Sequence, residues 1–510
     1  MNFKFLTAAS ALALGCLSTP AMAQHEHMPG MNMPTPKTPS EENKAAPKKA
    51  APKKPAPKEP AKKAPHKAVP LENPSAPVAM GHSQMSHDSM DQPTAPVPAE
   101  PPMDHSRMDH SKMQHGAAGG HAGHGAMSAA FGSYPLQRES SGTAWQPDTS
   151  DHMGWMAQTG DWSLMAHGVL NFVVDHQSGP RGDDKAFPSG MLMGMAQRPI
   201  GNGTLQFKAM LSPDPIMGKS GYPLLLASGE TANGTDRLID RQHPHDFFME
   251  LSGSVSQNIG PKSSAFLYAG LPGEPAFGPP AFMHRKAILD SPEAPISHHW
   301  LDSTHITFGV VTAGLVIDRV KLEVSRFNAR EPDQHRWNIE TGPLDSMSAR
   351  ISWNPTPELA LQGSWGHFED PEQLEPGVDQ KRWSASALYA REFAPGWKLA
   401  GTLAWGRKAA EGHKDDAFVA EASVKHADWT IFGRGEFTEN RELIDLVEHG
   451  PAYRVGKVSV GAVRDFRIAE HFTVGAGGLF AVNFMPDSLA PLYGGNNPIG
   501  AMGFLRLKLD

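Results

Sequence analysis

The chain has almost no cysteine. Its 510 residues contain one, Cys16, which lies in an N-terminal stretch typical of secretory signal peptides. A basic residue, an apolar run over residues 5–17 and small residues precede a predicted cut after Ala23, so residues 1–23 are the signal peptide. The mature chain then has no thiol, which excludes disulfides and Cys-based zinc sites. Acylation of Cys16 in a lipoprotein is the alternative, but Ala13-Leu14-Gly15 matches that motif poorly.

Long apolar runs and basic patches are also missing. No stretch after the signal peptide approaches the roughly 20 apolar residues of a membrane helix, which excludes a helical membrane protein but not a strand-spanning one. The net charge is −8, with 12 basic and 10 acidic side chains in residues 24–130 and 33 basic and 44 acidic side chains after residue 130. An acidic body without a basic patch argues against nucleic-acid partners and for cations.

Residues 24–130 contain few aromatic or branched aliphatic side chains and are rich in Pro, Ala, Lys, Met, His and Gly. This composition cannot bury enough apolar surface to offset the entropy of ordering, so we expect a disordered arm. Within the arm, residues 37–67 form a Pro/Lys/Ala spacer that favours extended conformations. Its lysines either keep the arm soluble or contact the anionic cell wall, and composition leaves both open.

The arm repeats Met and His at a five-residue step, as Met103-Asp104-His105-Ser106-Arg107, Met108-Asp109-His110-Ser111-Lys112 and Met113-Gln114-His115. Thioether sulfur suits Cu(I) and Ag(I), while imidazole binds both Cu(I) and Cu(II), so the repeat predicts a metal-binding arm. Low-complexity composition without a metal role is the alternative. The candidate ligands are Met80, His82, Met85, His87, Met90, Met103, His105, Met108, His110, Met113, His115, His121, His124 and Met127.

The texture changes to β-strands from about residue 161 to the end, with period-two alternation between turn residues. In residues 397–405, Trp397 and Leu403 occupy one face, and Lys398 and Thr402 occupy the other. Such a segment rises about 20 Å along a tilted barrel, close to the apolar band of an outer-membrane barrel. A soluble sandwich gives the same alternation, so the connections between strands decide.

These connections alternate between long and short. Long segments are predicted at 485–500, 439–454, 408–415, 369–381, 328–346, 271–302 and 212–244, and short ones at 427–428, 394–396, 355–357, 312–313, 258–261 and 199–202. Long external loops and short periplasmic turns are typical of outer-membrane barrels. We therefore predict an all-β, transmembrane outer-membrane β-barrel of about 16 antiparallel strands over residues 161–510. A connector, 131–160, precedes it, and the even strand count places the arm in the periplasm.

A second group of candidate ligands lies in the barrel region. Arg241-Gln242-His243-Pro244-His245-Asp246 enters one strand, and Pro244 keeps its neighbours extended, so the two imidazoles can point the same way. Asp246 could orient an imidazole as a hydrogen-bond acceptor. With the residues that follow, this group predicts a second metal site near the external mouth or in the lumen. Histidines that only hydrogen-bond the barrel wall are the alternative. The following residues are Met283, His284, His298, His299 and His305.

Met-Asp-His-Ser repeats in a secreted arm ahead of a β-barrel resemble the copper resistance protein B family. The resemblance covers the arm and extends to the barrel only in architecture. It implies an outer-membrane protein that binds copper, with Ag(I) as a second candidate, and sequesters or exports it from the periplasm. The implied partners are outer-membrane lipid, metal ions and periplasmic copper proteins. A general or solute-selective porin with an accessory arm is the alternative. We expect no enzyme, since no Gly-x-Ser-x-Gly elbow or phosphate-binding loop is present.

Overall fold

The computed structural model describes residues 127–151, 154–444 and 450–510. The signal peptide, the Pro/Lys/Ala spacer and all candidate arm ligands from Met80 to His124 lie outside these residues. The strands are β1 (Trp155–Thr159), β2 (Trp162–Gln177), β3 (Asp184–Ile200), β4 (Gly203–Leu211), β5 (Tyr222–Thr231), β6 (Arg237–Gln242), β7 (Phe248–Gly260), β8 (Ser263–Gly270), β9 (Val310–Ile317), β10 (Val320–Phe327), β11 (Ser346–Thr356), β12 (Leu359–Phe368), β13 (Gln380–Ala394), β14 (Trp397–Ala410), β15 (His413–His426), β16 (Trp429–Asn440), β17 (Tyr453–Ala469), β18 (Phe472–Phe484) and β19 (Ile499–Leu509). The helices are η3 (Leu136–Arg138), η4 (Asp214–Met217), η5 (Phe282–His284), α2 (His298–Leu301), η6 (Ser303–His305) and α3 (Ala490–Tyr493).

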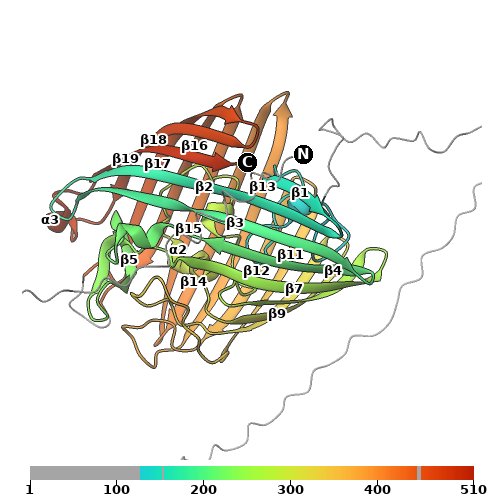
Figure 1. Cartoon of the computed structure of the whole chain (residues 1–510). Coiled ribbons are helices and arrows are strands. Elements are labelled where there is room, and N and C mark those ends of the chain that lie inside the picture. The colour runs from blue at the N-terminus through green and yellow to red at the C-terminus, as the bar shows by residue number, and fades with distance from the viewer. Residues whose placement is uncertain (1–126, 152–153, 445–449) are drawn as a thin grey trace, which may run out of the picture. The chain divides into compact units, whose positions relative to one another are not determined.

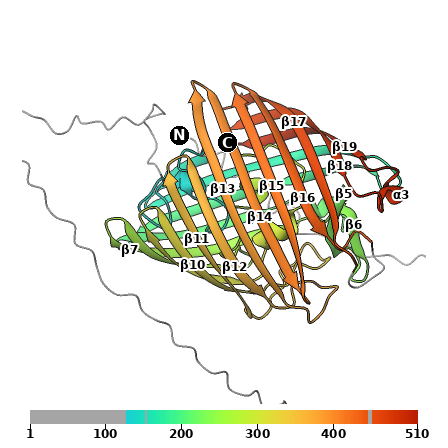
Figure 2. The same cartoon turned by 180° about the vertical axis from the view of Figure 1, so that it is seen from behind.

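Sixteen strands close into an antiparallel ring within the described residues, as predicted. Strands β2–β4 and β7–β19 pair with their neighbours, and β19 pairs back onto β2 to complete the barrel (Figures 1 and 2). The short strand β1 forms a hairpin with the first residues of β2, and β5 and β6 form a separate two-stranded sheet. No described helix is long and apolar enough to cross a membrane.

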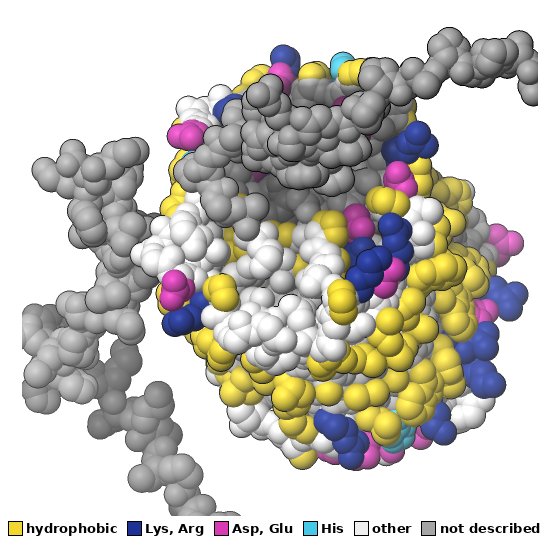
Figure 3. Space-filling model, turned by 90° about the vertical axis from the view of Figure 1, so that its right-hand side faces the viewer, with side chains coloured by type: hydrophobic (Ala, Val, Ile, Leu, Met, Phe, Trp, Pro, Cys, Tyr) yellow, Lys and Arg dark blue, Asp and Glu magenta, His cyan; other side chains and the backbone are white. Residues whose placement is uncertain are grey.

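The two faces of the wall are the reverse of those in a soluble sandwich. On β10, Leu322 and Val324 are 46% and 59% exposed, whereas Lys321 and Glu323 are 0% and 2% exposed. On β14, Leu403 is exposed and Thr402 is buried. Hydrophobic side chains accordingly form broad areas on the outer face seen in Figure 3. An apolar exterior around a polar interior suits lipid and not water, so the wall is that of a porin-like outer-membrane barrel.

The connections follow the predicted alternation with two corrections. Two-residue turns join the strand pairs at one end, while the other end carries long loops such as 212–247, 271–309 and 328–345. The predicted long loop at 408–415 is wrong, because β14 and β15 are joined by Glu411 and Gly412 alone. Both residues have positive φ, 49° and 85°, as a tight hairpin turn requires, and Glu is an unusual residue at such a position.

The predicted turn near 312–313 is also wrong, because β9 continues to Ile317 and turns at Asp318. Asp318 adopts a left-handed φ of 52°, which Asp tolerates better than most residues. Gly314 lies inside the strand for a packing reason. A Cβ at this glycine would lie 2.1 Å from the ring of Phe266, so the glycine makes room for a neighbouring side chain.

The lumen is filled by the segment 127–151 and by long loops folded inward. Lys208 on β4 donates to the Gly142 carbonyl at 2.8 Å, Gln197 on β3 donates to the Ser128 carbonyl at 2.8 Å, and Lys321 donates to the Thr143 carbonyl. The chain therefore contacts the lumen wall already at Met127 and Ser128, before the predicted end of the arm at residue 130. The predicted connector 131–160 largely lies against the inner wall, which the sequence did not indicate.

Candidate metal centre

Two inward-folded segments supply a cluster of histidines. The short link between β6 and β7 carries His243 and His245, and the loop 271–309 carries His298 and His299 on α2 and His305 on η6. Each of these five side chains is at most 7% exposed. The α2 turn contacts the inner wall at β13, β14 and β15, so the barrel fixes the position of the cluster (Figure 1).

Three members of the cluster meet closely, and we call His245, His298 and His305 the His trio. One potential ligand nitrogen from each lies within 4.8 Å of the other two. The His305 ring centroid is 5.1 Å from that of His245 and 5.2 Å from that of His298. Three imidazoles converging on one point match the donor set of sites that bind Zn²⁺ or Cu²⁺ through nitrogen.

The Nδ1 atom of each trio imidazole has an acceptor. His245 Nδ1 lies 2.8 Å from the Asp214 carboxylate, and His298 Nδ1 lies 2.8 Å from the Asp302 carboxylate. His305 Nδ1 lies 2.7 Å from the Asp302 backbone carbonyl. An acceptor at Nδ1 holds the proton there and leaves Nε2 as the lone-pair donor, which is how metal-binding histidines are oriented.

The Nε2 atoms of His245 and His305 are buried and have no hydrogen-bond partner among the described residues. A buried polar atom without a partner is costly, and such exceptions cluster at functional sites and at sites of bound ions or water. Both atoms belong to the trio. The orphaned nitrogens therefore fit a bound cation.

Burial favours the neutral form of His298 and His305. Desolvation lowers the pKa of His305 well below the ordinary value, and it also lowers that of His298, although the Asp302 carboxylate opposes the shift. The cluster histidines reinforce the effect, because each positive imidazolium would repel the others. A neutral imidazole is the form that binds a metal, so the site is ready for a cation at neutral pH.

The charges around the trio also favour a cation. Asp214 is 4% exposed, and no Lys or Arg in the described chain lies within ion-pair distance of it, since its one partner is His245. Asp302 shares the buried Arg285 guanidinium with Glu421, which leaves two carboxylates for one arginine. A cation at the trio would offset this excess negative charge.

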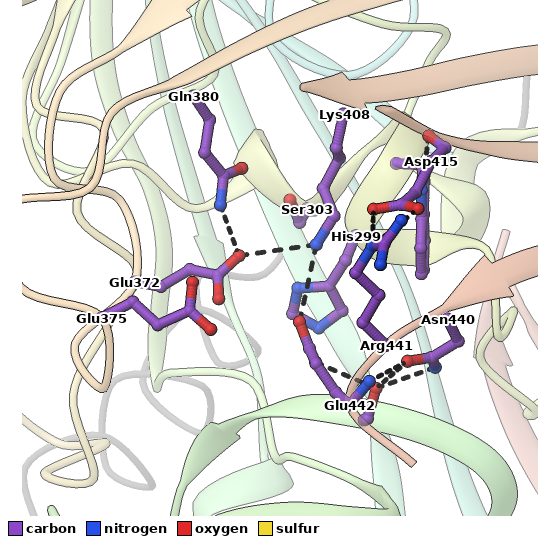
Figure 4. A network of polar contacts seen from close by, with 12 residues as sticks. His299, Ser303, Glu372, Glu375, Gln380, Lys408, Asp415, Asn440, Arg441 and Glu442 are labelled. Carbon is purple, nitrogen blue, oxygen red and sulfur yellow. Dashed lines mark hydrogen bonds and ion pairs between the residues drawn. The ribbon is translucent and has the colours of Figure 1, made fainter. Parts of the chain in front are cut away.

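The other two histidines of the cluster, His243 and His299, lie beside a charged network at the long-loop end. His243 lies 5.5 Å from His299, centroid to centroid, and His299 Nδ1 lies 3.2 Å from the Glu331 carboxylate. Burial lowers the pKa of His299, but the Glu331 charge and hydrogen bond outweigh it and raise the pKa overall. Close to His299, Lys408 lies between Glu372 and Glu442 (Figure 4).

This network borders a cavity of about 360 Å³ at the long-loop end. Its lining carries more carboxylates than cationic side chains, and Gln380 donates to Glu372 at 2.7 Å while Arg441 pairs with Asp415 at 2.9 Å. A polar, acidic cavity next to the histidine cluster attracts cations.

The predicted second site is only partly what the sequence suggested. His243, His245, His298 and His299 come together as predicted. Asp246 does not orient an imidazole, because its carboxylate pairs with Arg336 at 3.1 Å, and Asp214 and Asp302 take that role instead. Asp214 lies 31 residues before His245, so no local spacing indicates it.

Two other predicted residues lie beside the trio rather than in it. Met283 shares with His243 and His245 the lining of a cavity of about 50 Å³. His284 turns towards His167, with ring centroids 6.3 Å apart. Met127 is the one candidate arm ligand within the described residues, and it is buried among other methionines.

No protein-family model matches the chain, and no curated protein matches its sequence. Among solved structures, the barrel is similar to an anion-selective porin from Comamonas acidovorans, with 12% identity, a TM-score of 0.40, and coverage of 68% of this chain and 100% of the porin. It is also similar to OmpF of Salmonella typhi in complex with daunomycin, with 11% identity, a TM-score of 0.43, and coverage of 69% and 100%. OprB of Pseudomonas putida shows 9% identity, a TM-score of 0.43, and coverage of 68% and 94%.

Proposed function

We propose that this chain is an outer-membrane copper-binding protein whose barrel holds a metal ion in its lumen at the His trio. The observation that carries the proposal is the convergence of three buried imidazoles with two orphaned Nε2 atoms. Copper is favoured because the arm adds Met and His ligands that suit both of its oxidation states. Sequestration or export of periplasmic copper, and silver as a second cargo, follow from the same donor chemistry.

The resemblance to the copper resistance protein B family supports the choice of copper through the arm alone. The arm ligands from Met80 to His124 remain a prediction. The periplasmic placement of the arm, its contact with the cell wall and its exchange with periplasmic copper proteins belong to the same proposal. In this proposal the barrel adds to the arm a metal site of fixed geometry that is shielded from water.

Copper titration of the purified full chain tests the proposal. We expect His245→Ala, His298→Ala and His305→Ala together to remove one Cu(II) equivalent per chain. His176→Ala is the matched control, because this histidine is exposed and pairs with Asp184 at the outer loop. An unchanged Cu(II) stoichiometry in the triple variant would refute the lumen site. Growth of a deletion strain in graded copper, silver and zinc then tests the biological role.

A solute porin with an accessory arm is the second candidate. Cavities of about 360 and 390 Å³ lie at the two ends of the lumen, as a pore would require. Between them, however, Arg285 is fully buried and bridges the loop 271–309 to Glu421 on β15. Planar-bilayer conductance distinguishes the two, because a filled lumen predicts little steady current and an open sixteen-stranded pore predicts a large one.

A further inference from the structure

Methionines gather on one part of the inner wall. The six are at most 8% exposed and belong to one contacting cluster: Met165 on β2, Met191, Met193 and Met195 on β3, Met210 on β4 and Met249 at the β7 bulge. We call these six residues the methionine wall. Met127 and the partly buried Met283 contact the same cluster.

The strand register places thioethers opposite each other. Met165 pairs with Met195 across β2 and β3, and Met193 pairs with Met210 across β3 and β4. On its other side, Met193 faces His167. Directly opposed residues have Cβ atoms about 4.5–5.5 Å apart, so the flexible side chains can bring their sulfurs to one ion.

Apolar filling alone does not account for this choice of residue. The equivalent inward positions on β10 and β11 carry charged side chains, such as Lys321, Glu323 and Arg350. Branched aliphatic residues face the lumen elsewhere, as with Val173 on β2 and Val463 on β17, so sulfur is not required to fill an inward position. Three alternate methionines on one strand therefore concentrate sulfur on this part of the lumen wall.

Imidazoles and a cavity connect the wall to the His trio. The Nε2 atom of His284 is buried and has no hydrogen-bond partner among the described residues, and burial lowers the pKa of this imidazole. Its ring lies 6.3 Å from that of His167, which faces Met193. The 50 Å³ cavity is lined by Met191 and Met283 and also by His243 and His245, and it has room for an ion with a water ligand.

We propose that the methionine wall is a second metal site in the lumen, specific for the soft monovalent ions Cu(I) and Ag(I) and adjacent to the His trio. Thioether sulfur binds these ions and has little affinity for Zn²⁺ or for Cu(II) without other ligands, so the two sites divide the metals by softness. The inference rests on the proposed function for copper as the physiological metal. Met127, a candidate ligand of the arm, contacts the same cluster.

The test uses the full chain with the arm ligands from Met80 to His124 changed to Leu for Met and Gln for His, so that silver reports on the barrel. In this background, Met165→Leu, Met193→Leu, Met195→Leu and Met210→Leu remove the sulfur with little change of volume. Met502→Leu is the matched control, because it is 3% exposed on β19 and belongs to another cluster. Silver nitrate titration, X-ray absorption of bound Ag(I) and Cu(II) titration are the measurements.

We expect the fourfold variant to bind Ag(I) about tenfold more weakly or worse, since even ligand-supporting groups contribute that much, and to lose sulfur from the Ag(I) spectrum. Its Cu(II) binding stays equal to that of Met502→Leu. Equal Ag(I) affinity in the two variants would mean that the wall only packs the lumen. Failure of the proposed function looks different, because Cu(II) would then be absent while the sulfur-bound Ag(I) remained. Should the fourfold variant fail to fold, Met193→Leu with Met210→Leu gives the same comparison.

Discussion

Replacing Asp214 by Asn separates a metal-binding role of the His trio from a structural one. The Asp214 carboxylate accepts from His245 Nδ1 at 2.8 Å and from the Gly190 and His245 backbone amides at 3.3 and 3.4 Å. Asn has nearly the same shape, and its carbonyl oxygen can keep the hydrogen bond to the imidazole, while its NH2 group replaces the oxygen that accepts the long bond from the Gly190 amide. The substitution therefore removes the negative charge and leaves the packing in place.

The two roles predict opposite signs for the metal-free protein. Removing a carboxylate that orients a ligand imidazole lowers metal affinity about 10–100-fold, which is about 1.4–2.7 kcal/mol. Without metal, the buried Asp214 has no cationic partner of its own, so losing its charge costs nothing or stabilises. If the His245 hydrogen bond served only stability, the substitution would instead cost about 1.5–3 kcal/mol, as expected for a bond to a charged group.

The assay combines Cu(II) titration with thermal unfolding of the metal-free protein in detergent. Our account predicts weaker Cu(II) binding and an unchanged or higher Tm. Unchanged Cu(II) affinity together with a lower Tm would mean that the Asp214–His245 hydrogen bond serves stability and not metal binding.

Three further predictions follow from the same structure. Because burial lowers the pKa of His298 and His305, protons compete weakly with Cu(II) for these two ligands. We therefore expect the Cu(II) affinity to stay nearly constant on acidification to about pH 6, where an ordinary imidazole with pKa near 6.5 is already mostly protonated. A tenfold fall in affinity per pH unit below pH 7 would contradict this. Arg285→Ala leaves two buried carboxylates without their cationic partner, so we expect the folded protein to lose about 3–5 kcal/mol of stability, measured as a lower Tm. We also expect a higher bilayer conductance, because the loop 271–309 loosens. A conductance equal to that of the unsubstituted protein would show that another contact holds the loop. Gly314→Ala forces a Cβ into the Phe266 ring and should cost about 1–3 kcal/mol in thermal unfolding, whereas Gly194→Ala, whose Cβ meets nothing within 4 Å, should leave the Tm unchanged.

The orientation of the barrel strands was predictable because apolar and polar residues alternate along each strand. Leu322 and Val324 alternate with Lys321 and Glu323, and the long and short connections distinguish a membrane barrel from a sandwich. Turn positions were predictable where Pro-Gly marks them, as at residues 395–396. The turn at Glu411 was missed, because tertiary pairing imposes an unusual conformation there. A turn was wrongly predicted near residues 312–313, because Gly314 makes room for a neighbouring ring and does not mark a turn.

The site was predictable as a list of histidines but not as an arrangement. His245 and His298 are 53 residues apart and meet only because both loops fold inward, a placement that no local pattern encodes. The supporting carboxylates, Asp214 and Asp302, look like ordinary loop residues in the sequence. The methionine wall was visible in the sequence, because Met191, Met193 and Met195 alternate on one face of a strand. Treating that face as a set of sulfur ligands, and not only as apolar surface, would have predicted it.

The most direct test of the central claim is anomalous X-ray diffraction from crystals of the full chain loaded with Cu(II). We expect one anomalous peak in the lumen at about 2.0–2.1 Å from the Nε2 atoms of His245, His298 and His305, which is the usual metal–imidazole distance. A copper-loaded crystal with no peak there, and with water hydrogen-bonded to these nitrogens instead, would contradict it.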